Sequence, residues 1–216
     1  MPGAETTRAI VPLWLKLAYT AFMAVLVPVY WYHYGPTNFL YFCDVALFLF
    51  LIGIWLEHSL LISVATVGIL GTQALWVIDF VAQIGGFSVT GMTAYMFETE
   101  RPLYLRSLSL FHGWLPFFGL FLVWRLGYHR RAFWLWTVTA WALVLICFLY
   151  TPPPSPDRGI KPVNINYVYG FSSSEPQQWM SPVAWVLVEM AALPLLLCLP
   201  AHVLFRSRLF RQADMD

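Results

Sequence analysis

Cys43 and Asp44 stand side by side in a long apolar run, NFLYFCDVALFL, which covers residues 38–49. A thiol becomes a strong nucleophile when it loses its proton, and a neighbouring imidazole can take that proton. A carboxylate can then orient the imidazole and stabilise its cation, as in a catalytic triad. The chain offers such an imidazole in His112. These residue types would therefore allow acyl transfer by a Cys–His pair.

The composition indicates that these polar residues lie in a membrane. The 216 residues are 60% hydrophobic and 11% charged, with a mean hydropathy of +0.67, whereas soluble domains carry about 25% charged residues. A net charge of +1 excludes a strongly basic surface, and with it nucleic acid as a partner. The three cysteines lie inside apolar runs without a CxxC motif, so neither a disulfide framework nor a zinc site is indicated.

Six stretches are mainly apolar over the roughly 20 residues that a membrane-spanning helix needs. The first is interrupted by Lys16 and has no clear cleavage site, so we interpret it as a membrane helix and not as a signal peptide. The pattern predicts a single all-α domain over residues 1–216, a polytopic bundle of about six spans. The stretches cover approximately residues 11–32, 39–57, 59–82, 107–126, 132–150 and 182–205.

Two longer polar segments separate the predicted helices. Residues 86–106 are mixed and partly amphipathic and are expected to lie at the interface, and an additional interfacial or re-entrant helix there is left open. Residues 151–181 form a predicted extracytoplasmic loop rich in proline and aromatic residues. Lysine and arginine are more frequent on the opposite side, so the positive-inside rule predicts a cell-membrane protein with both termini cytoplasmic. That side holds Arg8, Lys16, Arg125, Arg130, Arg131, Arg206, Arg208 and Arg211, and the loop side holds Arg101, Arg106, Arg158 and Lys161.

The predicted helices bring five polar residues to one depth near the outer face of the membrane. Cys43 and Asp44 lie about 7–9 Å in, at 1.5 Å per residue. Charged residues at the centre of a membrane helix cost about 2.5–3.5 kcal/mol, so they normally face the bundle interior and find partners. A proline four residues after the histidine is expected to kink or open its helix. The five residues are Cys43, Asp44, Asp79, His112 and Glu189, and the proline is Pro116.

In the catalytic interpretation, Cys43 attacks an acyl carbonyl, His112 is the general base, and Asp79 or Asp44 orients the imidazole. Membrane lipids are the predicted partners, the oligomeric state is left open, and no metal or diffusible cofactor is expected. Further polar residues are predicted to bind substrate or to cover the site. They are Asn38, Gln73, Asn166, Tyr167, Tyr169 and Glu189.

Structural explanations stay open for the same residues. Cys43 could be a small buried hydrophobic residue, and an Asp–His hydrogen bond could simply lock two helices together. Haem held by two histidines is disfavoured, because only His112 is clearly deep. No GxGxxG, Walker A, HExxH or GxSxG motif occurs. Gly68 and Gly71 are expected to permit close helix packing.

Four short motifs between about residues 38 and 185 have counterparts in a known family. They are LYFCDVA (40–46), GILGTQAL (68–75) followed by Asp79, FHG (111–113), and NYVY (166–169) with Pro176 and Trp179. They resemble, in turn, the LxLCD-type segment, the Gly-x-x-Gly-x-x-Gln-Ala-Leu helix, the Phe-x-x-His-Gly motif and the Asn-Tyr-x-Tyr segment of the bacterial YwaF-like integral membrane proteins. The second motif has one residue fewer before the glutamine.

The resemblance implies acyl-chain chemistry. The YwaF-like family is related to transmembrane protein 164, which is associated with acyl transfer onto phospholipids through a cysteine and a histidine. The more distant androgen-induced-gene-1 branch hydrolyses fatty-acid esters with a threonine and a histidine. Carried over, the resemblance would assign the nucleophile to Cys43 and the base to His112.

The sequence thus favours a membrane-embedded acyl-ester hydrolase or acyltransferase that acts on lipid acyl chains. The alternative from another class is a small transporter or proton-coupled channel, with Asp44, Asp79, His112 and Glu189 as a relay. A third is a non-catalytic structural membrane subunit. The absence of an internal repeat and the off-centre position of the polar layer favour the enzyme over the transporter.

Overall fold

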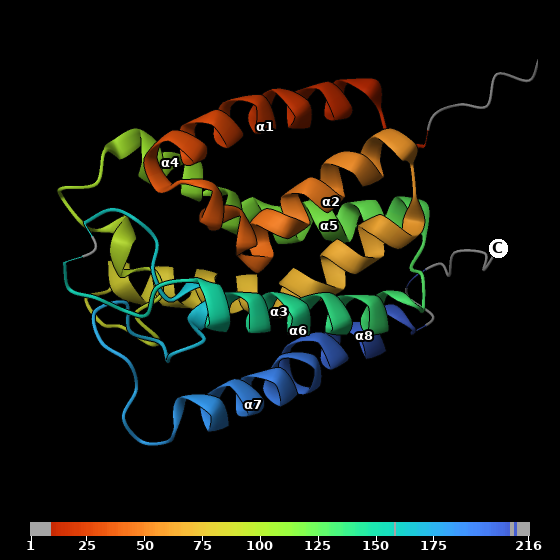
Figure 1. The fold of residues 1–216 in the computed structure, drawn as a ribbon. Helices are drawn as coiled ribbons and strands as arrows, with labels where there is room; N and C mark the ends of the chain where they lie inside the picture. The colour runs from red at the N-terminus through yellow and green to blue at the C-terminus, as the bar shows by residue number, and fades with distance from the viewer. Residues whose placement is uncertain (1–9, 158, 208–209, 211–216) are drawn as a thin grey trace, which may run out of the picture.

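The computed structural model describes residues 10–157, 159–207 and 210. Arg8, Arg158, Arg208 and Arg211, which contribute to the predicted charge asymmetry, lie outside this part of the chain. The described residues form a bundle of helices without strands (Figure 1). The prediction of an all-α bundle of apolar, membrane-spanning helices is confirmed.

Within the described part of the chain, five helical segments are long and apolar enough to cross a membrane. Two of them are interrupted: α4 and α5 meet at Leu110, and a π-helical segment, η4, joins α7 to α8. The sixth predicted span, α2, is apolar but only 15 residues long. The helices are α1 (Leu13–Tyr34), α2 (Phe42–Leu56), α3 (Ser59–Ile84), α4 (Leu103–Ser109), α5 (Phe111–Leu126), α6 (Ala132–Tyr150), α7 (Pro182–Ala192), η4 (Leu193–Cys198) and α8 (Leu199–Phe205).

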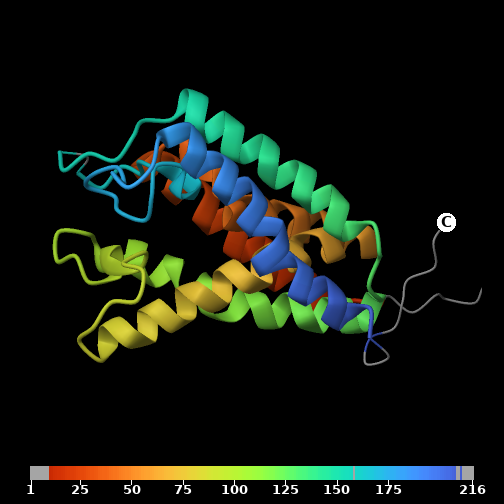
Figure 2. The same cartoon turned by 90° about the horizontal axis from the view of Figure 1, so that it is seen from below.

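The segments between helices are short 3₁₀ turns and loops. The region 86–106, where an additional helix was left open, contains only the 3₁₀ turn η2 (Ala94–Met96) and the first residues of α4. A 3₁₀ turn also precedes α2, as η1 (Pro36–Leu40), and another, η3 (Ile165–Tyr167), lies in the 151–181 loop. The two long loops gather at one end of the bundle, which we call the loop end, while the start of α1 and the end of α8 lie at the opposite end (Figures 1 and 2).

Helix α3 is the centre of the bundle and packs against α2, α5, α6 and η4. Small residues allow this close packing. A Cβ on Gly68 would lie 2.0 Å from the ring of Trp136 on α6, and one on Gly71 would lie 2.7 Å from the carbonyl oxygen of Leu197 on η4. Both glycines thus permit the approach expected from the sequence.

A polar clamp fixes the chain at the end opposite the loops. Glu57, which ends α2 in a left-handed conformation with φ 51°, accepts a hydrogen bond from Lys16 Nζ at 2.8 Å. The same carboxylate accepts the backbone N–H groups of Ile10 and Val11, at 3.0 and 3.1 Å. Arg125 adds a 2.6 Å hydrogen bond to the carbonyl oxygen of Ile10. Ile10 and Val11 are therefore held against α2 and α5.

Candidate functional site

A cavity of about 480 Å³ lies beneath the loop end of the bundle. Its volume falls within the roughly 300–1,000 Å³ typical of ligand pockets. Residues from α2, α3, α5 and α7 line it, as do residues from both long loops. The chemically active members of the lining are Cys43, Asp44, Gln73, His112, Tyr167 and Glu189. Four of the five residues that the sequence placed at one depth thus meet in one cavity.

His112 lies in the first turn of α5 and is oriented by Gln73 on α3. The distance between His112 Nδ1 and Gln73 Oε1 is 2.8 Å. Because an amide oxygen only accepts, Nδ1 carries the proton, and Nε2 keeps the lone pair. The ring also stacks on Trp76, with centroids 4.8 Å apart. Among the described residues Nε2 has no hydrogen-bond partner, so it is free to act as a base.

Pro116 contributes to the local shape of α5. It has no N–H, so the carbonyl four residues earlier, that of His112, lacks its usual helical donor. The helix nevertheless runs unbroken from Phe111 to Leu126, and the interruption falls just before it, at Leu110. The interruption thus lies near His112 but on its N-terminal side, where Pro116 does not account for it.

Cys43 and Asp44 occupy the first turn of α2. The Asp44 carboxylate is 2% exposed, and its Oδ2 accepts a hydrogen bond from Asn38 Nδ2 at 3.1 Å. The Cys43 thiol lies 3.9 Å from the same oxygen. The other carboxylate oxygen, Oδ1, has no hydrogen-bond partner among the described residues. A buried, unpartnered oxygen is costly, which marks this position for a ligand or a proton.

Asn166 joins the 151–181 loop to the start of α2. Its Oδ1 accepts the backbone N–H of Phe42 at 3.0 Å, and its Nδ2 donates to the carbonyl oxygen of Leu40 at 2.8 Å. The side chain thus satisfies a backbone group that a helix leaves free at its first turn. Asn166 has φ 60° and Tyr167 has φ 67°, a left-handed conformation that is uncommon outside glycine. The strained turn brings Tyr167 into the wall of the cavity.

Tyr167 supplies a hydroxyl group to the cavity. Trp185 on α7 donates its Nε1–H to the backbone carbonyl of Tyr167 at 2.8 Å and so fixes the turn. Burial raises the pKa of Tyr167 well above its usual range, and electrostatic interaction with Tyr41 adds to this. The hydroxyl therefore stays protonated at neutral pH and can donate a hydrogen bond.

Glu189 approaches the cavity from α7. Its Oε2 is buried and has no hydrogen-bond partner among the described residues. Together with Asp44 it gives the cavity two carboxyl groups, each with one unpartnered oxygen. Among the described residues, no group of three or more His, Cys, Asp or Glu side chains gathers in a way that could hold a metal ion.

Asp79 is not brought to His112. It is fully buried, but it is not part of the cavity lining, and its oxygens are occupied by the loop that follows α3. This loop folds around the carboxylate, which compensates the buried charge with several short hydrogen bonds. The donors are the N–H groups of Val89, Thr90, Gly91 and Thr93, the hydroxyl of Thr93 and the side-chain amide of Gln83.

Two further expected residues differ in their placement. Asn38 lines the cavity through its bond to Asp44. Tyr169, which was expected to bind substrate or cover the site, points away from it: its hydroxyl donates to the carbonyl oxygen of Phe148 at the end of α6, at 2.9 Å. Tyr169 is absent from the cavity lining, so its observed contacts anchor the loop.

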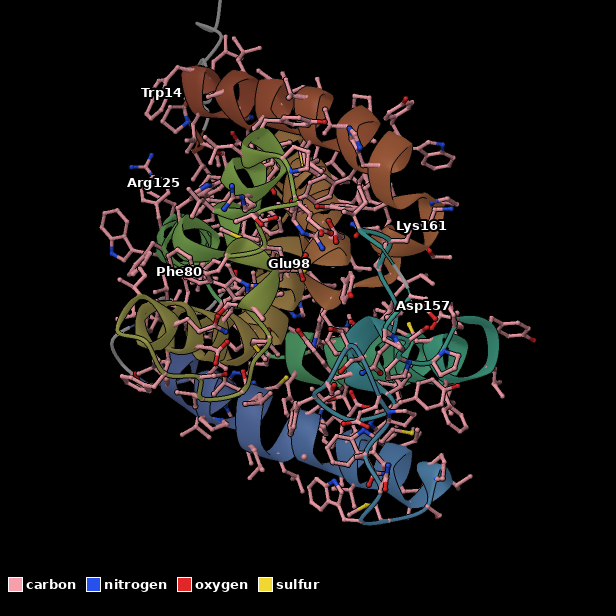
Figure 3. All side chains as sticks on the ribbon, turned by 90° about the vertical axis from the view of Figure 1, so that its left-hand side faces the viewer. Trp14, Phe80, Glu98, Arg125, Asp157 and Lys161 are labelled. Atoms are coloured by element: carbon pink, nitrogen blue, oxygen red, sulfur yellow. The ribbon has the colours of Figure 1, made fainter. Side chains whose placement is uncertain are left out.

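The sequence analysis missed a cluster at the loop end. Arg101, only 5% exposed, lines the cavity and donates to the hydroxyl of Tyr34 at 2.7 Å. It pairs with Glu98 at 3.1 Å and lies 5.3 Å from the ring centroid of Tyr95. Figure 3 looks onto this end, with Glu98 near the middle of the view. The feature of the sequence that could have indicated this cluster is the arginine that precedes Pro102. In the sequence analysis this arginine contributed only to the charge asymmetry.

No protein-family model, curated protein or solved structure matches the chain. The resemblance carried by the four short motifs therefore stays a prediction. The functional argument rests on the cavity and on the residues that line it.

Proposed function

We propose that the chain is a membrane-embedded acyl-ester hydrolase or acyltransferase that acts on lipid acyl chains through Cys43 and His112. The observation that carries the proposal is that both residues line one cavity, with His112 held by Gln73 so that Nε2 is the basic nitrogen. The resemblance to the YwaF-like proteins supports the same proposal, because it assigns the nucleophile and the base to the same two residues.

The proposed reaction begins with transfer of the Cys43 thiol proton to His112 Nε2. The thiolate attacks the acyl carbonyl and forms a carbon–sulfur bond, and the carbonyl electrons move onto oxygen. The Tyr167 hydroxyl is the proposed donor to this oxyanion, since a preorganised donor there stabilises the developing charge. Collapse breaks the ester bond, and His112 returns its proton to the leaving alcohol. A thioester on Cys43 remains.

The second half of the reaction releases the acyl group. Water, or the hydroxyl of an acceptor lipid, attacks the thioester while His112 takes its proton, and the thiolate leaves and is reprotonated by His112. Water gives a free fatty acid, and an acceptor lipid gives a transferred acyl chain. Asp44, next to Cys43, would stabilise the imidazolium electrostatically, while the hydrogen bond that orients the ring comes from Gln73.

Covalent labelling tests this proposal. Purified protein would be treated with a p-nitrophenyl ester of an alkyne-tagged fatty acid, and mass spectrometry would locate the thioester. We expect an acyl adduct on Cys43, none on the buried Cys147 and Cys198, and loss of the adduct in His112→Ala. His33→Ala is the matched control, because that histidine lies outside the cavity. Equal labelling in His112→Ala and wild type would refute the Cys–His pair.

A proton relay is the second candidate, and the unpartnered oxygens of Asp44 and Glu189 favour it. Carboxyl groups facing a cavity within a membrane bundle are typical of proton pathways. The test is proton flux into liposomes that contain the protein. Flux that disappears in Glu189→Gln and persists in Cys43→Ser would support the relay, while absence of flux in the wild type would exclude it.

We also propose that the protein resides in the cell membrane with both termini in the cytoplasm. The support is the excess of lysine and arginine at the end of the bundle opposite the loops, which includes Lys16 and Arg125. A reporter enzyme that is active only in the cytoplasm, fused to the C-terminus, checks the orientation. An inactive fusion with full expression would reverse it.

A further inference from the structure

The cavity lining has two parts. The polar chamber holds Cys43, Asp44, Gln73 and His112, and a mainly apolar part, which we call the arm, is formed by α3 together with α7 and η4. Its α3 wall is formed by Thr72, Leu75 and Trp76, and its opposite wall by residues of α7 and η4. The latter are Val188, Ala192, Leu193, Leu196 and Leu197. The arm thus connects the chamber around Cys43 to the side of the bundle.

Part of this arm lies on the outer surface of the bundle. Val188 is 50% exposed and Leu196 is 69% exposed, and both line the cavity. Each lies within a helical segment that is long and apolar enough to span a membrane. The surface of such a segment faces hydrocarbon and not water. The arm therefore opens sideways, toward lipid chains.

The packing of α3 explains why an opening exists here. At Gly71 the helix approaches η4 so closely that a Cβ would lie 2.7 Å from the carbonyl oxygen of Leu197. From there α3 and α7 diverge toward the loop end (Figure 2). Helix α7 itself packs against α6. Segment η4, which contains Pro194, is π-helical, and such segments are frequent at functional sites.

We propose that the arm between α3 and η4 is a lateral portal that admits one hydrocarbon chain of a membrane lipid. The nature of the occupant follows from the surroundings of the arm. The outer end of the arm is apolar and faces the membrane core, and its inner end meets the polar chamber. A lipid matches both ends, because its hydrocarbon chain is apolar and its ester group is polar. The portal rests on the proposed function in one respect, which is that the entering chain brings its acyl carbonyl to Cys43.

Alkylation of Cys43 tests the portal without requiring catalysis. In a Cys147→Ala/Cys198→Ala background, Cys43 is the only thiol. The protein in liposomes would be treated with a maleimide that carries a long alkyl chain and, separately, with a sulfonated maleimide that stays in water. We expect Leu196→Trp to slow the alkyl reagent about tenfold, because the enlarged side chain overfills the arm. The rate with the sulfonated reagent should not change.

Leu195→Trp is the matched control. Leu195 is 57% exposed on the same segment but does not line the cavity, so neither reagent should be slowed. Leu196→Ala is the opposite change and should accelerate the alkyl reagent, which provides a test even if the tryptophan variant does not fold. Equal effects of the two tryptophan variants, equal slowing of both reagents by Leu196→Trp, or absence of alkyl labelling of Cys43 would each overturn the portal.

The same experiments separate this inference from the proposed function. Alkylation requires only that a reagent reaches the thiol, whereas acyl labelling requires the Cys–His pair. Portal-dependent alkylation without an acyl adduct would retain the portal and refute the enzyme. An acyl adduct that forms equally well in Leu196→Trp and Leu195→Trp would retain the enzyme and refute the portal.

Discussion

His112 Nδ1 donates to Gln73 Oε1 across 2.8 Å, and this hydrogen bond joins the first turn of α5 to the middle of α3. It fixes which imidazole nitrogen carries the proton and which keeps the lone pair. The partner is an uncharged amide, whereas the sequence analysis expected a carboxylate. An amide orients the ring without drawing the proton from it, so the imidazole stays neutral until it accepts a proton at Nε2.

Replacing Gln73 tests this orientation. Gln73→Leu removes the acceptor, and we expect the rate of acyl labelling of Cys43 to fall by at least about tenfold. A positioned general base contributes about 10²–10⁴-fold to a rate, and loss of its orientation should remove part of that factor. Gln73→Glu keeps an acceptor at the same place and should retain most of the labelling. Gln178→Leu, at an exposed position outside the cavity, serves as the control. Unchanged labelling in Gln73→Leu would show that the bond has no positioning role.

Asp79 is expected to act as the anchor of the loop that follows α3. Asp79→Ala leaves the N–H groups of Val89, Thr90, Gly91 and Thr93 without their acceptor, which should lower the free energy of unfolding by about 2–4 kcal/mol. Limited proteolysis should then cut the chain between residues 86 and 102. If the loop stays resistant while acyl labelling is lost, Asp79 acts on the reaction and not on the loop.

Replacement of Gly68 and of Gly113 by alanine should have opposite effects on the stability of the bundle. A Cβ at Gly68 would lie 2.0 Å from the Trp136 ring, so Gly68→Ala should destabilise the bundle by about 3 kcal/mol. At Gly113 nothing lies within 4 Å of an added Cβ, so Gly113→Ala should be neutral or stabilise by up to about 1 kcal/mol. Thermal unfolding in detergent measures both. Similar melting temperatures for the two variants would contradict the packing of α3 on α6.

The clamp at Glu57 should make stability depend on pH. Burial acts to raise the pKa of Glu57, but hydrogen bonds from Lys16 and from the N–H groups of Ile10 and Val11 outweigh it and lower this pKa. A carboxyl whose pKa is lower in the fold stabilises the fold above its unfolded pKa, near 4.3, and loses that contribution as the pH falls through the folded value.

Glu57→Gln is the matching variant. The free energy of unfolding of the wild type should exceed that of Glu57→Gln by about 1 kcal/mol at pH 7, and the difference should vanish as the pH falls through the folded pKa of Glu57. Unfolding by heat or denaturant, followed by circular dichroism at pH 7 and at a series of lower pH values, gives the comparison. A difference that does not change with pH would mean that the clamp acts through packing alone.

The apolar helices follow directly from the sequence. In a membrane each segment must satisfy its own backbone hydrogen bonds, so a run of about 20 apolar residues is sufficient to predict a helix. The close-packing roles of Gly68 and Gly71 could also be predicted, because only a missing side chain lets two helices approach so closely. Depth along each helix correctly grouped Cys43, Asp44 and His112, since the rise per residue is constant.

The tertiary structure decided which polar groups meet. Depth is only one coordinate, and Asp79, which lies at a similar depth, turns to a loop that folds back on it, while Gln73 takes the place beside His112. The region 86–106, where a further helix was left open, begins with this loop, because the hydrogen bonds to Asp79 stabilise an irregular backbone. Which side of a helix faces which neighbour depends on packing between distant segments, and the sequence of any one helix does not contain that information.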